Sequence, residues 1–420
     1  MSTAVITKSA PAPRKPAGKR KLSLAQWMLV IAAGLALFSL VRLITDAHGI
    51  TSTGQVSAAL RLAVPIGMAG LGGLWAERAG VINIGLEGML ILGTWFGAWA
   101  GVQWGPWTGV IFGIVGGMIG GLIHAIATVS FGVNHIVSGV AVNILAVGAT
   151  RYLSSFTFAE MEGGTVKQSP PIEDIQSITV PGLSEWMKTL NDKHWFFVSD
   201  LAGFVGGAVT NLSLLVVIAL ALIPLSWWVL WRTSFGLRLR SCGENPTAAE
   251  SLGVNVYKYK YLAVIISGGF AGFGGFFLAE VSNIYQEGQT GGRGYIGLAA
   301  MIFGNWMPGG LAMGAGLFGY ADSLNLRGGG ANVHALLLFL AILLALAVAW
   351  ELYRRKYLTA LVAGVTGLGL FAYYLAVDEV PSQFVSAAPY VATLLVLALS
   401  AQRLRPPKSI GRSYRKGEGK

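Results

Sequence analysis

Residues 106–129 read PWTGVIFGIVGGMIGGLIHAIATV and contain no Asp, Glu, Lys or Arg. A helix needs about 20 consecutive apolar residues to cross the roughly 30 Å hydrocarbon core of a bilayer. The stretch is long enough, and its many glycines suit helices whose backbones approach closely within a membrane. It therefore predicts a membrane-spanning helix.

The same pattern recurs along the chain and predicts an all-α, polytopic membrane protein. Of the 420 residues, 54% are hydrophobic and only 12% are charged. A soluble protein of this length needs far more charged surface, because Lys, Glu, Arg and Asp normally stay in water. About ten spans are predicted, at residues 25–45, 56–75, 85–103, 106–129, 134–153, 211–231, 261–280, 333–350, 358–377 and 387–402.

The distribution of charge predicts which segments face the cytoplasm. Lys and Arg gather in the tails 1–24 and 403–420 and in the loop 232–260, whereas 154–210 is mostly acidic. Because cytoplasmic loops of membrane proteins are enriched in Lys and Arg, we expect both termini and 232–260 inside and 154–210 outside. The net charge of +11 thus follows from topology and does not indicate nucleic-acid binding. The proline-containing basic tail 1–24 is expected to be disordered.

One apolar stretch, 296–322, is interrupted by MPGG at 307–310. If the basic residues 354–356 lie inside, this stretch must enter and leave on the same face, as two half-length helices. A single kinked span is the alternative, and it would reverse the orientation of everything that follows. In the first case a weak repeat, GLEGM at 85–89 and GLAAM at 297–301, would be inverted, as in transporters whose substrate path lies at a repeat interface. Chance similarity between glycine-rich segments is the alternative to a repeat.

Several kinds of chemistry find no support in the sequence. There is no Gly-x-x-x-x-Gly-Lys-Ser/Thr motif to hold the phosphates of a nucleotide. The single cysteine, Cys242, excludes an internal disulfide and a cysteine-cluster metal site, and the five histidines lack metal-ligand spacing. We expect no catalytic residue, no cofactor and no metal in this chain.

The loop 232–260 contains the sequence GENPTAAESLGVN at 243–255. Asn245 suits the N-cap of a helix and Pro246 its first position, while Gly253 accepts the left-handed conformation that ends a helix. The pattern predicts a short cytoplasmic helix that presents Ala248 and Ala249 to a soluble partner. A plain connecting helix is the alternative.

This loop resembles the coupling-helix region of bacterial ABC importer permeases, in the branch that serves ribose-type sugars, branched-chain amino acids and nucleosides. Two further segments, AERAGVINIGLEGM at 76–89 and GGRGYIGLAAMIFGNW at 291–306, are most similar to the nucleoside-type permeases of that family. The resemblance covers about residues 56–325, and the long 154–210 segment departs from its compact members. It implies that ATPase coupling involves Glu244, Asn245, Pro246, Ala248, Ala249 and Gly253.

The resemblance implies a transport subunit and not a complete pump. Residues 25–402 would be the permease domain, embedded in the lipid of a bacterial cytoplasmic membrane. The implied partners are a cytoplasmic ABC ATPase, a second homologous permease and an extracytoplasmic substrate-binding lipoprotein. Nucleosides are the favoured solutes, with simple sugars and branched-chain amino acids as alternatives. A lone ion-coupled carrier is less favoured, because it needs several buried acids and the chain offers little beyond Glu87 and Glu280.

Seven residues in or beside the spans are candidates for the substrate path. An ionisable group such as Glu87 is expensive in a membrane and usually faces a cavity or a polar partner, here alternatively Arg78. Carboxamides match the donors and acceptors of a nucleobase or ribose, but they also form interhelical hydrogen bonds. Aromatic rings can stack on a base or simply pack. The candidates are Asn83, Glu87, Trp95, Asn143, Phe303, Asn305 and Trp306.

Overall fold

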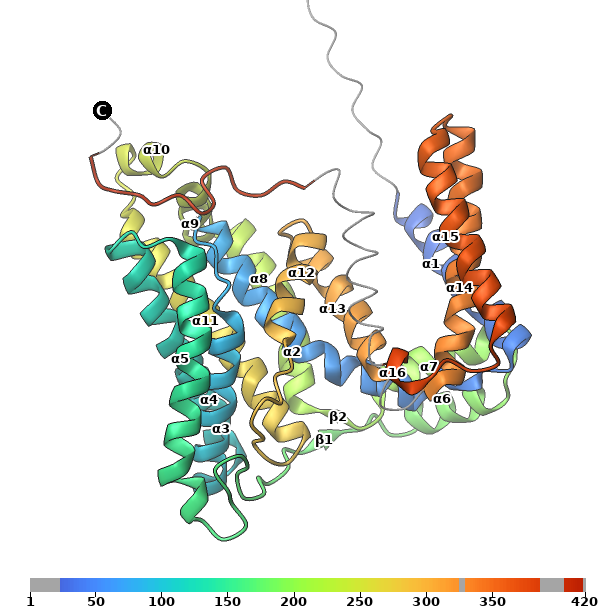
Figure 1. Ribbon diagram of the computed structural model, residues 1–420, viewed down its shortest axis with the longest axis horizontal. Helices are drawn as coiled ribbons and strands as arrows, with labels where there is room; N and C mark the ends of the chain where they lie inside the picture. Colours follow the sequence, from blue (N-terminus) through green and yellow to red (C-terminus); the bar gives the residue numbers. More distant parts are fainter. Residues whose placement is uncertain (1–22, 325–328, 386–403, 418–420) are drawn as a thin grey trace, which may run out of the picture.

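The computed structural model describes residues 23–324, 329–385 and 404–417 and is built almost entirely from helices (Figure 1). Over these residues the sheet consists of one short antiparallel pair, β1 with β2. The helices and strands are α1 Leu24–Thr45, α2 Thr53–Arg78, α3 Leu86–Trp104, α4 Pro106–Ala125, α5 His135–Phe156, β1 Ser177–Ile178, α6 Leu183–Asp192, α7 Val198–Val209, β2 Leu212–Ser213, α8 Leu214–Arg232, α9 Ser234–Glu244, α10 Pro246–Ser251, α11 Val256–Val281, α12 Arg293–Phe303, α13 Pro308–Ser323, α14 Gly329–Tyr353, α15 Tyr357–Ala376 and α16 Ser382–Val385.

The predicted all-α membrane architecture is confirmed. Among the described residues, eight helices are long and apolar enough to cross a bilayer: α1, α2, α4, α5, α8, α11, α14 and α15, with α4 and α5 extended by a following turn. The predicted span at 85–103 is also a helix, α3, which carries Glu87 and Gln103 among its 19 residues. The predicted span at 387–402 lies outside the described residues.

Glycine brings α4 and α11 into backbone contact with each other. A Cβ added to Gly117 would collide with the carbonyl of Gly268, and one added to Gly272 would collide with the carbonyl of Gly113. In a membrane, where lipid tails are as apolar as leucine, such close approach supplies the packing that holds helices together. The glycine content of residues 106–129 therefore specifies a helix–helix contact as well as a span.

The stretch predicted as two half-length helices forms α12 and α13, joined by a turn at 304–307. The turn meets the end of α2, since Arg78 Nε and Nη2 donate to the carbonyl of Trp306 at 3.0 and 2.6 Å. Near the far end of α13, the Tyr320 hydroxyl donates to the carbonyl of Ile50, in the segment between α1 and α2. The residues just before α12 pair with 167–168 of the acidic segment. Both outer ends of the pair thus lie on the side of the acidic segment, as predicted.

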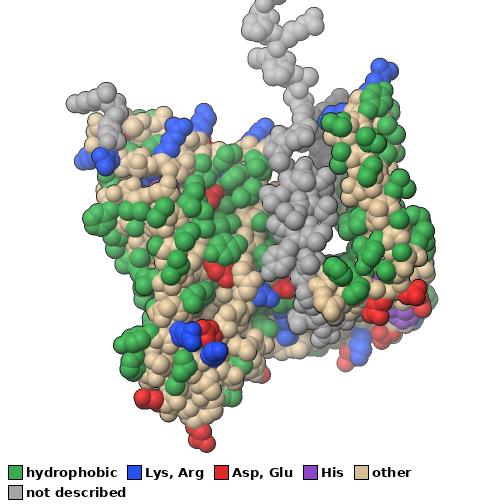
Figure 2. All heavy atoms as spheres, viewed as in Figure 1, with side chains coloured by type: hydrophobic (Ala, Val, Ile, Leu, Met, Phe, Trp, Pro, Cys, Tyr) green, Lys and Arg blue, Asp and Glu red, His purple; other side chains and the backbone are tan. Residues whose placement is uncertain are grey.

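Charge divides the two ends of the molecule. The C-terminal segment, α9 and α10 lie at one end, and α6, α7, β1 and β2 lie at the other (Figure 1). In the view of Figure 2, Lys and Arg occupy the edge at the α10 end and also occur in the opposite half, which is where Asp and Glu mainly gather. We call these the basic end and the acidic end. The basic end contains part of 232–260 and the acidic end contains part of 154–210, and the opposed orientation of these segments in the membrane stays a prediction.

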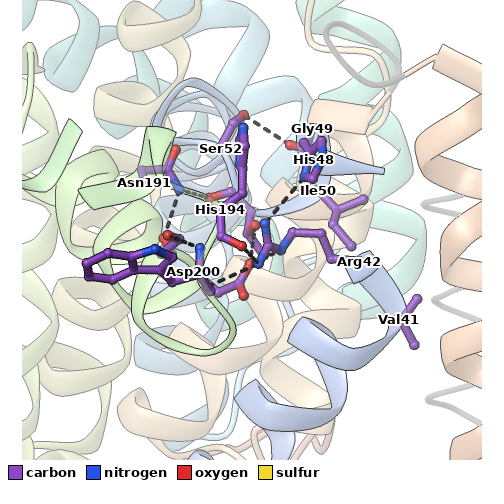
Figure 3. Close-up of polar contacts among 12 residues, drawn as sticks. Val41, Arg42, His48, Gly49, Ile50, Ser52, Asn191, His194 and Asp200 are labelled. Carbon is purple, nitrogen blue, oxygen red and sulfur yellow. Dashed lines mark hydrogen bonds and ion pairs between the residues drawn. The ribbon is translucent and has the colours of Figure 1, made fainter. Parts of the chain in front are cut away.

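A buried ion pair ties the acidic end to α1 (Figure 3). Arg42 Nε lies 2.8 Å from Asp200 Oδ1, and both side chains are buried, at 1% and 0% exposure. The Thr51 hydroxyl donates to the same carboxylate oxygen, and Arg42 Nη2 donates to the carbonyls of His194 and Trp195. We call Arg42, Thr51 and Asp200 the outer clamp. It fixes α7, and with it the 154–210 segment, to the end of α1.

Candidate functional site

Residues 79–85, between α2 and α3, form an irregular segment that lies mostly inside the protein. Buried non-helical backbone requires polar partners for its N–H and C=O groups. The side chains of three helical residues supply them. His135 Nδ1 lies 3.2 Å from the amide of Ile82, His124 Nε2 lies 2.9 Å from its carbonyl, and Asn143 Nδ2 donates to the carbonyl of Ile84 at 3.1 Å. The segment lets α3 begin within the molecule.

Glu87, in the first turn of α3, binds the start of α12. Its carboxylate accepts hydrogen bonds from the amides of Gly292 and Gly294, at 2.9 and 2.7 Å. These amides are among the unpaired donors that begin a helix, where the partial positive charge of the helix favours an anion. The alternative partner considered for Glu87, Arg78, binds Trp306 instead. The carboxylate is therefore an inter-helix cap, and its placement explains how a charged group is accommodated with only 7% exposure.

Asn143, on α5, completes a hydrogen-bonded junction of three helices. Its Oδ1 accepts from the amide of Gly88 at 2.7 Å, and its Nδ2 donates to the Tyr295 hydroxyl at 2.8 Å. Together, Glu87, Asn143, Tyr295 and the amides of 292 and 294 connect the starts of α3 and α12 to α5. We call this set the α3–α12 junction.

Asn83 lies beside this junction and differs from Asn143 in how it is satisfied. Its Nδ2 donates to the Ser267 hydroxyl on α11 at 2.9 Å. Its Oδ1 is buried and has no hydrogen-bond partner among the described residues. Of the candidate carboxamides, Asn83 thus offers a buried acceptor that no described group uses.

The two candidates at the α12–α13 turn, Asn305 and Trp306, form the turn and bind neighbouring parts of the chain. Asn305 and Trp306 both adopt left-handed conformations, with φ of 54°, which close the turn. Trp306 Nε1 donates to the buried carboxylate of Glu77 at 2.5 Å, and the amide of Arg405 donates to Asn305 Oδ1 at 2.8 Å. The turn is thereby joined to α2 and to the C-terminal segment.

The remaining aromatic candidates take part in packing. Trp95 is 3% exposed, and its Nε1 donates to the Ser154 hydroxyl on α5 at 2.8 Å. The Phe303 ring lies 5.7 Å from the Phe318 ring of α13. Of the seven candidates, the structure groups Asn83, Glu87 and Asn143, and separately Phe303, Asn305 and Trp306 at the α12–α13 turn, whereas Trp95 stands apart.

Two adjoining cavities open at the acidic end, and none of the seven candidates lines them. Their volumes are about 190 and 360 Å³, and they share Arg61, Asn211 and Val281. The smaller cavity also contains Asp174 and Glu280, of which Glu280 accepts a long hydrogen bond, 3.4 Å, from Ser213. Sequence reasoning missed this hollow, because its residues come from four separated segments.

The predicted short helix is α10, with Asn245 as its N-cap and Pro246 at its first position. Asn245 Oδ1 accepts from the amide of Ala248 at 3.1 Å, and Gly253 follows with φ of 80°. One expectation is wrong: Ala249 is 2% exposed and does not face water. It packs against Cys242 and Val256, because α10 folds back on α9 and α11. The exposed residues from 244 to 253 are Glu244, Asn245, Thr247, Ala248, Ser251, Leu252 and Gly253.

Burial in this contact also affects Cys242, on α9. Its side chain is fully buried, and this desolvation raises the pKa of the thiol to about 11. A thiol with such a pKa remains protonated at neutral pH and reacts slowly, because the thiolate is the nucleophile. We expect native Cys242 to resist thiol reagents. Labelling of the parent protein therefore measures the background in any cysteine-labelling experiment.

The C-terminal segment, residues 404–417, lies against α9 and α10 and was not expected to do so (Figure 1). The amide of Ser409 donates to the carbonyl of Gly243 at 2.9 Å, and that of Gly411 donates to the carbonyl of Gly80 at 3.1 Å. The Tyr414 ring lies 5.4 Å from the Tyr257 ring. The only sequence signal for this docking is the presence of Ile410 and Tyr414 within a basic tail.

Comparison with known proteins links this geometry to a family. Residues 55–348 match the family model described as branched-chain amino acid transport system / permease component. The guanosine ABC transporter permease protein NupQ of Bacillus subtilis is 33% identical over 372 residues, which cover 86% of this chain and 97% of NupQ. The nucleoside ABC transporter permease protein NupC of Lactococcus lactis is 32% identical over 86% of this chain and 97% of NupC.

A third relative carries a different solute in its name. The putative glucose ABC transporter permease protein TsgC13 of Haloferax volcanii is 32% identical over 66% of this chain and 78% of TsgC13. No solved structure matches the chain.

Proposed function

The chain belongs to the branched-chain amino acid transport system / permease component family, and on this premise we propose that it is the membrane permease subunit of an ATP-binding-cassette importer of nucleosides. The observation that carries the choice of solute is the similarity to NupQ and NupC, which extends over 97% of each relative. The eight described helices that suit a bilayer supply the multi-pass scaffold.

The proposal divides the transport cycle among several subunits. The permease has no phosphate-binding motif, so ATP hydrolysis is assigned to a cytoplasmic ABC ATPase. A second homologous permease and an extracytoplasmic binding lipoprotein complete the proposed complex. The basic end, with α10, faces the ATPase, and the acidic end faces the binding protein.

The exposed face of α10 is proposed as the contact with the ATPase. Leu252, directly after α10, is 85% exposed, although it is a large apolar residue in a polar loop, and Ala248 lies exposed on α10 itself. A helix that projects small and apolar side chains fits a groove on a partner. Leu252→Asp tests this contact, because its side chain packs against little in the permease. Ala249→Glu is unsuitable, since it would bury a carboxylate within the permease itself.

For the solute path we propose Asn83, whose buried Oδ1, beside the α3–α12 junction, has no hydrogen-bond partner in the part of the chain that the structure describes. A carbonyl oxygen at this position can accept a hydrogen bond from a ribose hydroxyl or a base N–H. Asn83→Leu should raise the KM for nucleoside uptake about tenfold, the effect of losing roughly 1.4 kcal/mol of binding. Unchanged kinetics at equal membrane abundance would remove Asn83 from the path.

Uptake by the reconstituted complex tests the proposed solute. Radiolabelled guanosine should enter proteoliposomes in an ATP-dependent manner, and an excess of unlabelled adenosine or uridine should compete. The similarity to TsgC13 makes glucose the second candidate. Competition by glucose and not by nucleosides would replace the proposal by sugar import, and accumulation without ATP would indicate an ion-coupled carrier.

Cysteine labelling tests the proposed orientation. Glu162 lies in the acidic segment and Lys416 in the C-terminal segment, and both are exposed. In a Cys242→Ala background, an impermeant thiol reagent applied to intact cells should label Glu162→Cys and spare Lys416→Cys. Labelling of Lys416→Cys alone would invert the topology.

A further inference from the structure

The C-terminal segment and α10 together enclose a groove at the basic end. Its volume is about 410 Å³, and its lining comes from both sides. From α9 and α10 come Glu244, Asn245, Pro246 and Thr247, and from the C-terminal segment come Lys408, Ser409, Arg412, Ser413, Tyr414 and Arg415. A partner that binds the start of α10 therefore also contacts the C-terminal segment.

The C-terminal segment is held in place by its backbone and its apolar side chains. The backbone amides of Ser409 and Gly411 donate the hydrogen bonds described above. In addition, the Ser409 hydroxyl donates to the carbonyl of Glu244 at 3.1 Å. Pro407 is buried, and Ile410 packs against the main apolar cluster of the helices. The basic side chains thus extend from a fixed backbone, which lowers the entropic cost of binding a partner through them.

The charge of the groove is positive. Lys408, Arg412 and Arg415 face a single acid in the lining, Glu244. The side chains of Lys408 and Arg412 are exposed to solvent. Complementary charge guides association and fixes the register of an interface, so the surface suits an occupant with negative charge.

We propose that this groove is a second half of the ATPase docking surface, and that it receives an acidic segment of the ATPase while α10 enters the ATPase itself. This inference rests on the proposed function and adds a contact to it. A concave site that shares residues with the start of α10 fits a projecting protein segment better than a flat bilayer. Anionic lipid is the competing occupant, and the test distinguishes the two.

Two double variants with equal changes of charge provide the test. Lys408→Glu/Arg412→Glu reverses two cations that line the groove. Arg405→Glu/Lys416→Glu reverses two exposed cations of the same segment that do not line it. The complete transporter is purified in neutral detergent, and retention of the ATPase is measured against salt concentration.

The groove variant should weaken ATPase binding about tenfold or more, because like charges would then oppose each other across the contact. The control variant should bind as the parent does. Parental binding should itself weaken at high salt, as expected for solvent-accessible charges. Parental retention of the ATPase by the groove variant would overturn the proposal.

Lipid binding would give a different pattern. Both variants would then retain the ATPase in detergent, and both would bind less to vesicles of phosphatidylglycerol. This result would also overturn the proposal.

The Leu252→Asp variant separates this inference from the proposed function. If Leu252→Asp releases the ATPase while the groove variant retains it, α10 docking stands and the second contact is wrong. If neither variant releases it, the assignment of the whole basic end to ATPase docking is wrong. ATP-dependent guanosine uptake by the parent remains an independent measure of the function.

Discussion

Two buried carboxylates, one in the α3–α12 junction and one in the outer clamp, are stabilised in different ways. Glu87 accepts hydrogen bonds from two backbone amides at the start of a helix. Asp200 instead forms an ion pair with the guanidinium of Arg42 and accepts a hydrogen bond from the hydroxyl of Thr51. The first arrangement brings two helix ends together without introducing a second ionised side chain. The second buries a full cation beside a full anion. The difference predicts how each region responds when a partner is removed.

The largest effect is expected from Asp200→Ala in the outer clamp. Removing the carboxylate leaves the Arg42 guanidinium buried without its counter-ion, which costs about 3–5 kcal/mol. Thermal unfolding of the purified protein should show a lower midpoint, and limited proteolysis should cut 154–210 earlier. The control is Asp192→Ala, at the exposed end of α6, which should behave as the parent.

A double variant sharpens the same point. Arg42→Leu/Asp200→Leu removes both charges, and apolar replacement of a buried pair is often neutral or stabilising. The double variant should therefore unfold at a higher temperature than Asp200→Ala alone. Equal or greater destabilisation would show that the hydrogen bonds of Arg42 to 194–195, and not its charge, hold the clamp.

Glu87→Gln is expected to have the next largest effect. The amide keeps one oxygen for the helix start but loses the charge, and a hydrogen bond to a charged group contributes about 1.5–3 kcal/mol. Stability and uptake should fall together, because Glu87 positions α12. Lost uptake at parental stability would instead show that the carboxylate acts on the solute or on coupling.

Gly294→Ala tests the close approach of the two helix starts. A Cβ at Gly294 would lie 2.6 Å from the amide nitrogen of Glu87, so α12 must move away from α3. Overpacking of this kind costs about 1–3 kcal/mol. The matched control is Gly316→Ala in α13, where nothing lies within 4 Å of the added Cβ. Equal thermal midpoints for both variants would contradict the tight junction.

Tyr295→Phe should have the smallest effect. It removes one hydrogen bond, from Asn143 Nδ2 to the tyrosine hydroxyl, and leaves the ring in place. The expected loss of unfolding free energy is about 0.5–1.5 kcal/mol. Measured with Asn143→Ala in a double-mutant cycle, the two changes should be non-additive, since they remove the same bond. Additive losses would place the hydroxyl and the carboxamide in separate interactions.

Much of the scaffold was predictable from local sequence. Long apolar stretches gave the spans, MPGG at 307–310 gave the break between α12 and α13, and Asn245 with Pro246 gave the start of α10. These features depend on residues that are close together in the sequence, within one turn of helix, or on the fixed thickness of a bilayer. A single sequence is therefore enough to predict them.

The direction in which each side chain points, and the partner that it contacts, could not be predicted in the same way. A membrane helix is apolar on all sides, so periodicity does not identify its buried face. Glu87 was recognised as costly, but its partners at 292 and 294 lie far along the chain. The Arg42–Asp200 pair and the docking of Tyr414 likewise join distant segments. Ala249 was placed in water because the fold of α10 back onto α9 has no local signal.

The glycine contact between α4 and α11 has a mechanical consequence. Because carbonyls at 113, 117 and 268 rest directly against the opposing backbone, the two helices cannot slide past each other without a collision. They must move as one rigid body. Movement during a transport cycle must therefore occur at other helix–helix interfaces. Spin labels on Trp107 and Val281, exposed on the two helices, should keep a constant separation with and without ATP.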